Sequence, residues 1–182
     1  MDFQPRLTDG IVSLRPLEAE DRDALYAIAS DPALWALHPA HDRWREPVFR
    51  AWLDAGLDSG TALVVEDAAT GTPIGYSRYG LAHAQEGEVE IGSTFLARAY
   101  WGGPVNRAMK RLMIGHALAV YERVIFLIGE DNLRSRRAME KIGGHLTDRR
   151  VGAEMAGRIV SHLVYAIDRP GFASGPLAPP LV

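Results

Sequence analysis

A strand, a glycine turn and a long helix within residues 88–121 hold the residue types best suited to chemistry. Glu90 lies in an alternating strand, Trp101–Gly103 form the turn, and Pro104 stands where a first helical residue would stand. A glycine turn that opens a helix leaves backbone N–H groups free, and the helix dipole adds positive potential. This pattern predicts a phosphate site, although an ordinary capped strand-to-helix connection has the same pattern.

The helix after the turn has an apolar face with 3.6-residue spacing, made of Val105, Met109, Leu112, Met113, His116, Ala117 and Val120. Arg107, Lys110 and Arg111 lie nearer the other side. We expect each of them, taken singly, on a solvated face. Its place beside the turn makes Arg107 the best candidate of the three for a phosphate.

A second polar group surrounds a shorter helix, expected over residues 133–141. Asp131 or Asn132 can cap its start, and Gly143 ends it. The helix carries a basic cluster of Arg134, Arg136 and Arg137. Either these cations face water, or one of them, with Arg136 favoured, reaches a phosphate.

The irregular stretch 31–44 is rich in aromatic and histidine side chains, with Trp35, His38, His41 and Trp44. Taken singly, each tryptophan is expected to pack in the core or in a lid. His38 and His41 are three residues apart, but no third ligand of suitable type is evident. We therefore expect no metal.

Composition excludes several classes of protein. The formal net charge of -3 argues against a general nucleic-acid binder. The absence of cysteine excludes disulfides, thiolate metal sites and a cysteine nucleophile. No apolar run is long enough for a membrane span, and no signal peptide opens the chain, so we expect a cytoplasmic protein without membrane or nucleic-acid partners.

The chain predicts one α+β domain over residues 1–168, followed by a Pro/Gly-rich tail over 169–182. The expected helices are 21–30, 45–57, 105–121 and 133–141. The expected strands are 11–15, 61–66, 73–80, 88–96, 124–128, 145–151 and 158–167. This order predicts a mixed, mostly antiparallel sheet with helices on both faces.

Two motifs resemble those of the GNAT (Gcn5-related) N-acetyltransferase superfamily, in particular its ribosomal-protein-alanine N-acetyltransferase group. The first motif consists of Trp101, Gly102 and Gly103, and the second of Asn132, Ser135, Glu140, Lys141 and Gly143. The resemblance covers roughly residues 11–166. Pro104 stands where the family usually has its second loop glycine, and Asn106 where it has a small residue.

The resemblance implies a six- or seven-stranded sheet in which the fourth and fifth strands splay apart. It also implies acetyl-CoA as co-substrate. The contacts that it implies for acetyl-CoA are Thr94, Phe95, Leu96, Trp101, Gly102, Gly103, Val105, Asn106, Arg107, Asn132, Ser135 and Arg136. The residues that it implies for binding the acceptor amine are Trp35, His38, Trp44 and Glu90.

The implied reaction is direct attack of a primary amine on the thioester in a ternary complex. Glu90 is the expected base, through a water. Met139 stands where many relatives have a tyrosine that donates a proton to the leaving thiolate. Ser135 is then the nearest substitute for this general acid. The acceptor is a small molecule or a protein N-terminus, and a homodimer is possible in this superfamily. The alternative is a non-catalytic domain that binds CoA as a sensor or serves as an interaction module.

Overall fold

The structure is a computed structural model that describes residues 1–178. Its strands form one sheet in the order β1-β2-β3-β4-β5-β6-β8-β7. The strands are β1 Leu7–Thr8, β2 Val12–Pro16, β3 Ala62–Asp67, β4 Pro73–Gly80, β5 Glu88–Leu96, β6 Arg123–Gly129, β7 His145–Met155 and β8 Arg158–Asp168. The α-helices are α1 Arg22–Ala29, α2 Pro32–Trp35, α3 Glu46–Asp58, α4 Val105–Leu118, α5 Leu133–Lys141 and α6 Arg169–Ser174, and short 3₁₀ turns are η1 Ala19–Asp21 and η2 Arg98–Tyr100.

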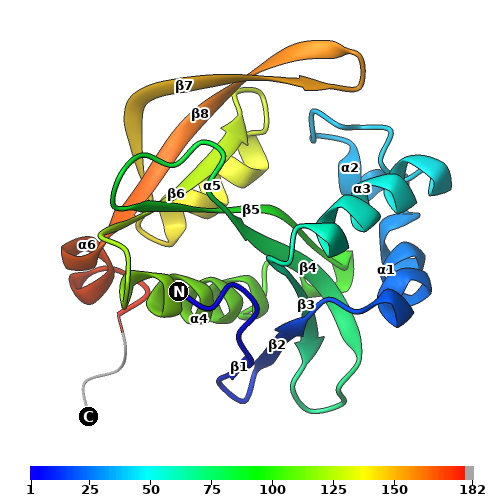
Figure 1. The fold of residues 1–182 in the computed structure, drawn as a ribbon, viewed down its shortest axis with the longest axis horizontal. Helices are drawn as coiled ribbons and strands as arrows, with labels where there is room; N and C mark the ends of the chain where they lie inside the picture. Colours follow the sequence, from blue (N-terminus) through cyan, green and yellow to red (C-terminus); the bar gives the residue numbers. More distant parts are fainter. Residues whose placement is uncertain (179–182) are drawn as a thin grey trace.

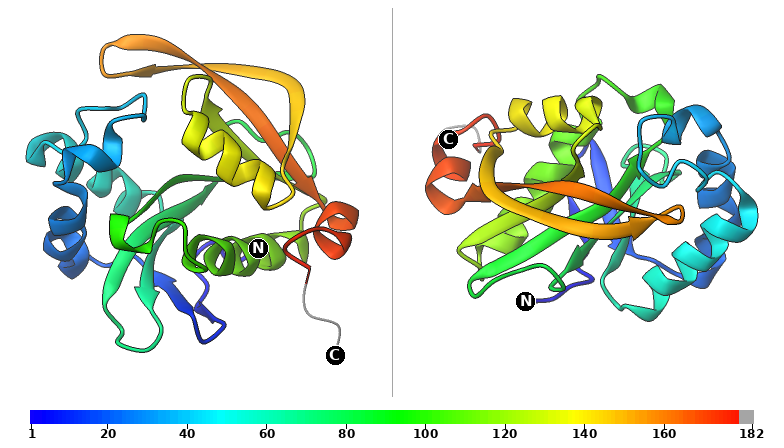
Figure 2. Two further views of the ribbon diagram at one scale, coloured as in Figure 1. Left: turned by 180° about the vertical axis from the view of Figure 1, so that it is seen from behind. Right: turned by 90° about the horizontal axis from the view of Figure 1, so that it is seen from above.

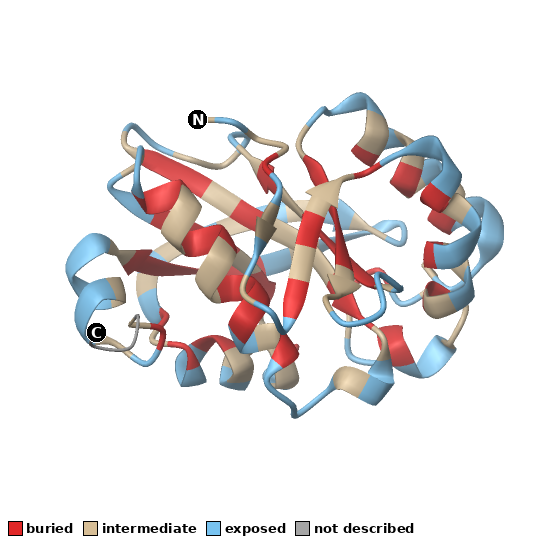
Figure 3. Cartoon of the chain, turned by 90° about the horizontal axis from the view of Figure 1, so that it is seen from below, coloured by how far each residue is buried: buried red, intermediate tan, exposed pale blue. Residues whose placement is uncertain are grey.

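Helices cover both faces of the sheet, as predicted (Figure 1). The larger apolar cluster packs α4 against one face, and a second cluster packs α1 and α3 against the other face of β3 and β4. Buried residues run along the central strands, while loops and outer helical turns are mostly exposed (Figure 3). The long β7–β8 hairpin reaches beyond the sheet, and its tip leans toward the loop between α2 and α3 (Figures 1 and 2).

The two central strands part along their length, which confirms the predicted splay. β5 and β6 run parallel and pair only at Glu88–Arg123, Val89–Val124 and Glu90–Ile125. Both strands continue beyond these pairs, β5 to Leu96 and β6 to Gly129. We call the diverging segments, residues 91–96 and 126–129, the fork. Backbone groups of β5 that face the fork are therefore outside the β5–β6 ladder.

A bulge at Ser93 changes which face the end of β5 presents. Ser93 has a φ of 54°, and three residues of β5 span the same register as two of β4. Because side chains alternate along a strand, one extra residue moves the following side chains to the opposite face. Val89 and Ile91 pack on the α4 face before the bulge, and Leu96 packs there after it.

Three parts of the fold differ from the sequence prediction. The stretch 31–44, predicted to be irregular, contains the short helix α2, which Asp31 caps. The sheet gains an eighth strand, β1, since Leu7 and Thr8 pair with β2. The segment predicted as a tail forms α6, and Leu177 behind it is 2% exposed in the larger core cluster. Apolar residues among the prolines and glycines explain this packing. Residues 179–182 of the predicted tail lie outside the described residues.

Candidate functional site

Glu90 lies at the last β5–β6 pair, on the sheet face opposite α4. Its Oε2 is 2.8 Å from Nδ1 of His83, and its side chain is 17% exposed. Its Oε1 lies along the strand toward the fork. A Cβ built on Gly92 would be only 2.8 Å from this oxygen. One carboxylate oxygen is thus held by His83, and the other faces the fork.

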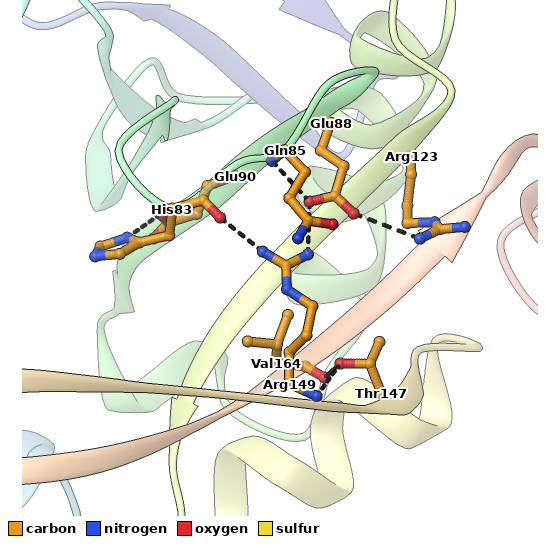
Figure 4. A network of polar contacts seen from close by, with 8 residues as sticks. All are labelled: His83, Gln85, Glu88, Glu90, Arg123, Thr147, Arg149 and Val164. Carbon is orange, nitrogen blue, oxygen red and sulfur yellow. Dashed lines mark hydrogen bonds and ion pairs between the residues drawn. The ribbon is translucent and has the colours of Figure 1, made fainter.

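A buried ion pair fixes the loop that carries His83. Arg149 donates to Glu88 Oε2 at 2.7 Å and to the backbone oxygen of His83 at 2.8 Å (Figure 4). Arg149 reaches inward from β7 where the register with β8 shifts between Leu146 and Arg150. The geometry therefore links the β7 bulge to the Glu90–His83 pair.

Glu88 stays charged in this network although it is 4% exposed. Burial acts to raise its pKa, but hydrogen bonds from Arg149 and from the Gln85 N–H outweigh burial and leave the pKa below its ordinary value. Arg123 adds a longer contact at 3.4 Å to Glu88 Oε1.

The three β5 residues predicted to bind acetyl-CoA lie at and beyond the bulge. Thr94 points to the α4 side, where its Oγ1 is 2.8 Å from Ser77 Oγ. The Phe95 side chain joins the aromatic cluster on the other face, with its ring stacked on Tyr76 at 5.9 Å between centroids. The backbone oxygen of Leu96 accepts a hydrogen bond from Trp101 Nε1 at 2.9 Å.

The tryptophan–glycine corner is open. Gly102 has a φ of 76°, a conformation that favours glycine, and no heavy atom of the described residues other than its chain neighbours lies within 4 Å of a Cβ built there. Gly103 is similarly free, with its nearest contact a backbone oxygen at 3.7 Å. Pro104 is the N-cap of α4, so helix geometry leaves the N–H groups of Val105, Asn106 and Arg107 directed at this corner.

The basic residues at the corner differ from those favoured by sequence. Arg134, on α5, places its guanidinium carbon 4.0 Å from the centroid of the Trp101 ring. Arg107 is exposed and donates to the backbone oxygen of Pro176. Arg136 donates to Tyr165 Oη at 3.2 Å and to the backbone oxygen of Glu130 at 3.1 Å. Arg134 is the cation closest to the exposed Trp101 among these three.

The start of α5 is fixed by Asn132, which is 4% exposed. Its Oδ1 accepts a hydrogen bond from the Ser135 N–H at 3.2 Å, so it is the N-cap, as predicted. Ser135 is half-buried on the first turn, and Met139 is buried one turn later.

A depression of about 390 Å³ lies between the α2–α3 loop, the end of β6 and the tip of the β7–β8 hairpin. His38 and Asn132 both line it, whereas Trp35 and Trp44 do not. Trp35 is 2% exposed and donates from Nε1 to Ala29 O at 2.7 Å, which fits the core-packing alternative. Trp44 is exposed, with Arg45 beside its ring.

His38 is an uncharged histidine in this depression. Burial, followed by the nearby charges of Arg43, His162 and Arg134, lowers its pKa to about 3. Its Nδ1 accepts a hydrogen bond from the Ala40 N–H at 3.0 Å, so the proton of the neutral ring is on Nε2. This N–H group is then available as a donor.

Sequence reasoning missed His83, Arg149 and Lys110. Lys110 was expected on a solvated face of α4, but it is 5% exposed and donates from Nζ to Thr94 Oγ1 at 3.0 Å. The buried arc of α4 is wider than the predicted stripe, because the helix packs under the centre of the sheet. For His83 the only signal was its nearness in sequence to Glu90.

Within residues 1–178, no cluster of three histidine or acidic side chains is arranged to hold a metal ion. The same part of the chain contains no helix with the length and apolarity that crossing a bilayer requires.

Comparisons with known proteins show which family and which folds this chain resembles. Residues 12–145 match the family model "Acetyltransferase (GNAT) domain". A GCN5-related N-acetyltransferase from Brucella melitensis is 22% identical, with a TM-score of 0.80 over 94% of this chain and 81% of that one. No curated protein matches the chain.

Two solved structures that contain CoA compounds share the fold. RimJ from Mycobacterium smegmatis, in complex with CoA-disulfide, is 20% identical, with a TM-score of 0.69 over 91% of this chain and 86% of that one. Spermidine N-acetyltransferase from Vibrio cholerae, in complex with CoA and spermine, is 13% identical, with a TM-score of 0.68 over 91% and 100%. The family match spans most of the chain, and the chain therefore belongs to the GNAT acetyltransferase family.

Proposed function

We propose that the protein is an N-acetyltransferase that moves an acetyl group from acetyl-CoA to a primary amine by direct attack. The fork supports this proposal most strongly. It has β5 backbone that is not paired with β6, and the Glu90 carboxylate lies at its base. An extended pantetheine arm can bond such backbone in the manner of an added strand. Residues 94–96 are its proposed partners, and the backbone N–H of Phe95 or Leu96 is the candidate to polarise the thioester carbonyl.

The open corner supports a site for the diphosphate of acetyl-CoA. Gly102 and Gly103 leave space, the first N–H groups of α4 point into it, and Arg134 on Trp101 adds a cation. Pro104 contributes no N–H, and we assign the compensating contact to the Asn106 side chain. Arg107, Arg136, Asn132 and Ser135 remain predicted contacts of acetyl-CoA.

Glu90 is the proposed base. An amine must lose a proton before or during attack, and the Glu90 carboxylate can take that proton directly or through a water. His83 holds the second oxygen of this carboxylate and fixes its orientation. His38 Nε2 is a proposed hydrogen-bond donor to the acceptor molecule in the neighbouring depression.

The proposed acceptor is a small-molecule amine or a protein N-terminus. A screen of both classes with acetyl-CoA, following thiol release, tests the proposal. We expect Glu90→Gln to lower kcat by about 10²–10⁴-fold on the best acceptor. Glu154→Gln, an exposed glutamate on β7, is the matched control and should leave kcat unchanged. Equal rates for Glu90→Gln and the wild type would exclude Glu90 as the base.

The alternative is a CoA-binding sensor without turnover. Pro104 in place of a loop glycine and Met139 in place of the acidic tyrosine favour this alternative. Binding of acetyl-CoA by calorimetry, without thiol release in the presence of either acceptor class, would support it.

A further inference from the structure

Lys110 occupies an unusual position for a lysine. It extends from α4 into the sheet, where its Nζ donates to Thr94 Oγ1 on β5 at 3.0 Å and lies 5.2 Å from the centroid of the Phe126 ring on β6. These two strands are the sides of the fork, and Phe126 directly follows the last residue of β6 that pairs with β5. The amine of Lys110 therefore lies at the base of the fork.

The polar surroundings of Lys110 are sparse. Thr94 Oγ1 also contacts Ser77 Oγ on β4, which makes a chain of two hydroxyls and one amine. Within the described residues, no carboxylate forms a salt bridge with Lys110, and burial lowers its pKa to about 7. An ammonium has three donors, and a buried cation without a counter-ion is costly unless a ligand supplies one.

Lys110 and Glu90 approach the fork from opposite sides. Lys110 belongs to the α4 face, together with Val89 and Ile91. Glu90 alternates with these residues and therefore points to the other face, which its partner Ile125 shares. A thioester lying in the fork would thus have the carboxylate on one side and the amine on the other.

We propose that Lys110 is the proton donor to the sulfur atom that leaves during acetyl transfer. This inference rests on the proposed function. The nitrogen of the acceptor amine forms a bond to the acetyl carbon. The carbon–sulfur bond breaks, and the electron pair of that bond goes to sulfur. The Lys110 ammonium gives one proton to this sulfur and becomes neutral. The proton lost by the attacking nitrogen goes to Glu90, and Lys110 regains a proton from solvent when CoA leaves.

Lys110 is better suited than Ser135 to donate the proton to the leaving sulfur. Ser135 lies on the first turn of α5, where its N–H is part of the helix cap. A serine hydroxyl is also a far weaker acid than an ammonium. The Lys110 amine lies between both sides of the fork, and among residues 1–178 it forms no salt bridge with a carboxylate that would hold its proton.

The decisive measurement is the pKa of the thiol of bound CoA, followed by ultraviolet absorbance of the thiolate. An ammonium beside the sulfur should lower this pKa by about 1–3 units in the wild type. Lys110→Met should abolish the shift. Lys141→Met, which removes the only other lysine and is exposed, should retain it. Equal thiol pKa values in the wild type and Lys110→Met would overturn the proposal.

A second measurement needs no substitution at Lys110. Because the chain has two lysines, labelling with isotopic lysine gives two side-chain signals by NMR, assigned with Lys141→Met. We expect CoA to raise the apparent pKa of Lys110, since thiol and amine titrate as a pair. A Lys110 titration that CoA leaves unchanged would contradict the proposal, even if Lys110→Met does not fold.

Kinetics separate this inference from the proposed function. On an active acceptor, Lys110→Met should lower kcat by about 10²-fold or more with little change in KM for acetyl-CoA. Thiol release by the wild type with an unshifted thiol pKa would overturn only the role of Lys110. A shifted thiol pKa without transfer to any amine would overturn the proposed function and the proton transfer that rests on it, while the contact between Lys110 and the thiol would stand.

Discussion

Gly92 provides the space that the Glu90 carboxylate occupies. A methyl group at this position would lie 2.8 Å from Glu90 Oε1, so the flexible carboxylate must move. We expect Gly92→Ala to lower kcat/KM by about 10- to 100-fold, since a displacement of about 1 Å in a catalytic group has effects of this size. Steady-state kinetics and denaturant unfolding together measure this.

Gly152→Ala on β7 is the control for Gly92→Ala, because its Cβ would make an ordinary contact of 3.7 Å with Ile159. The free energy of unfolding of Gly92→Ala should remain within about 0.5 kcal/mol of the wild type. Unchanged kcat/KM in Gly92→Ala would show that the orientation of Glu90 has no part in the reaction.

His38 should make stability depend on pH in a mildly acidic range. Its pKa is about 6.5 in the unfolded chain and about 3 in the folded protein, so between these values the unfolded chain binds more protons. The free energy of unfolding should therefore fall as pH decreases from 6.5, by at most about 1.4 kcal/mol per pH unit. The lowered pKa of His162 acts in the same direction.

Denaturant unfolding between about pH 7 and 4.5 measures this dependence, because the histidines of the unfolded chain titrate over about this interval. His38→Asn should give a shallower slope, because Asn keeps an acceptor for the Ala40 N–H but has no titrating ring. His145→Asn, at an exposed position, is the control. Parallel curves for His38→Asn and the wild type would contradict a lowered pKa of His38 in the folded protein.

The position of a single residue was predictable from sequence where a local pattern or motif carried the information. Glu90 follows from strand alternation and family resemblance, and Asn132 from the capping pattern before a helix. His83 and Lys110 do not, because their partners are brought to them by the sheet and by helix packing. A lone lysine in an amphipathic pattern is normally assigned to solvent, and only the fork shows otherwise.

At the scale of elements, the β7 bulge determines what holds the His83 loop. Arg149→Met should leave the buried Glu88 carboxylate with the Gln85 N–H and the longer contact to Arg123, and its 4% exposure makes that charge costly. We expect the free energy of unfolding to fall by about 3 kcal/mol, as for other broken buried pairs. Denaturant unfolding measures the loss, and kcat should fall as the His83 loop becomes mobile.

Arg150→Met is the matched control for Arg149→Met. Arg150 is the next residue and pairs with Glu130, but both side chains are largely exposed. Its loss should cost less than about 1 kcal/mol. Adding Glu88→Gln to Arg149→Met should recover part of the stability, and an additive double variant would show that the two residues are not coupled.

The strands and helices themselves were mostly predictable, since alternation and 3.6-residue periodicity are local properties. The seven expected strands are present, and the fork agrees with the family resemblance. The Ser93 bulge was not predicted, because nothing in the local pattern marks a non-glycine residue with positive φ. β1 was missed because two residues carry no periodicity, and α6 because its segment is rich in Pro and Gly.

At the scale of the whole molecule, the sheet brings groups from distant parts of the chain to one place. The fork lies where the parallel pair β5–β6 joins two antiparallel sections of the sheet. α4 covers one face and carries both the corner and Lys110, while the loop with His83 lies on the other face with Glu90. The position of α4 therefore matters both for the proposed diphosphate site at the corner and for Lys110 at the base of the fork.

The C-terminal segment clamps α4 along its length. Arg169 donates to Leu118 O at 2.9 Å at one end of the helix, and Pro176 O accepts from Arg107 at the other. Between them, Phe172 packs so closely that a Cβ built on Gly115 would lie 3.4 Å from its ring. Leu177 then enters the core that α4 shares with the sheet.

We therefore expect Leu177→Ala to behave as a core substitution although it lies in a segment predicted as a tail. Its 2% exposure predicts a loss of about 2–5 kcal/mol in the free energy of unfolding, whereas Ile159→Ala, at a residue 77% exposed, should lose far less. A looser α4 should also weaken CoA binding, measured by calorimetry at a temperature where the variant remains folded. Wild-type stability in Leu177→Ala would mean that the Leu177 side chain makes no contribution to the core that holds α4.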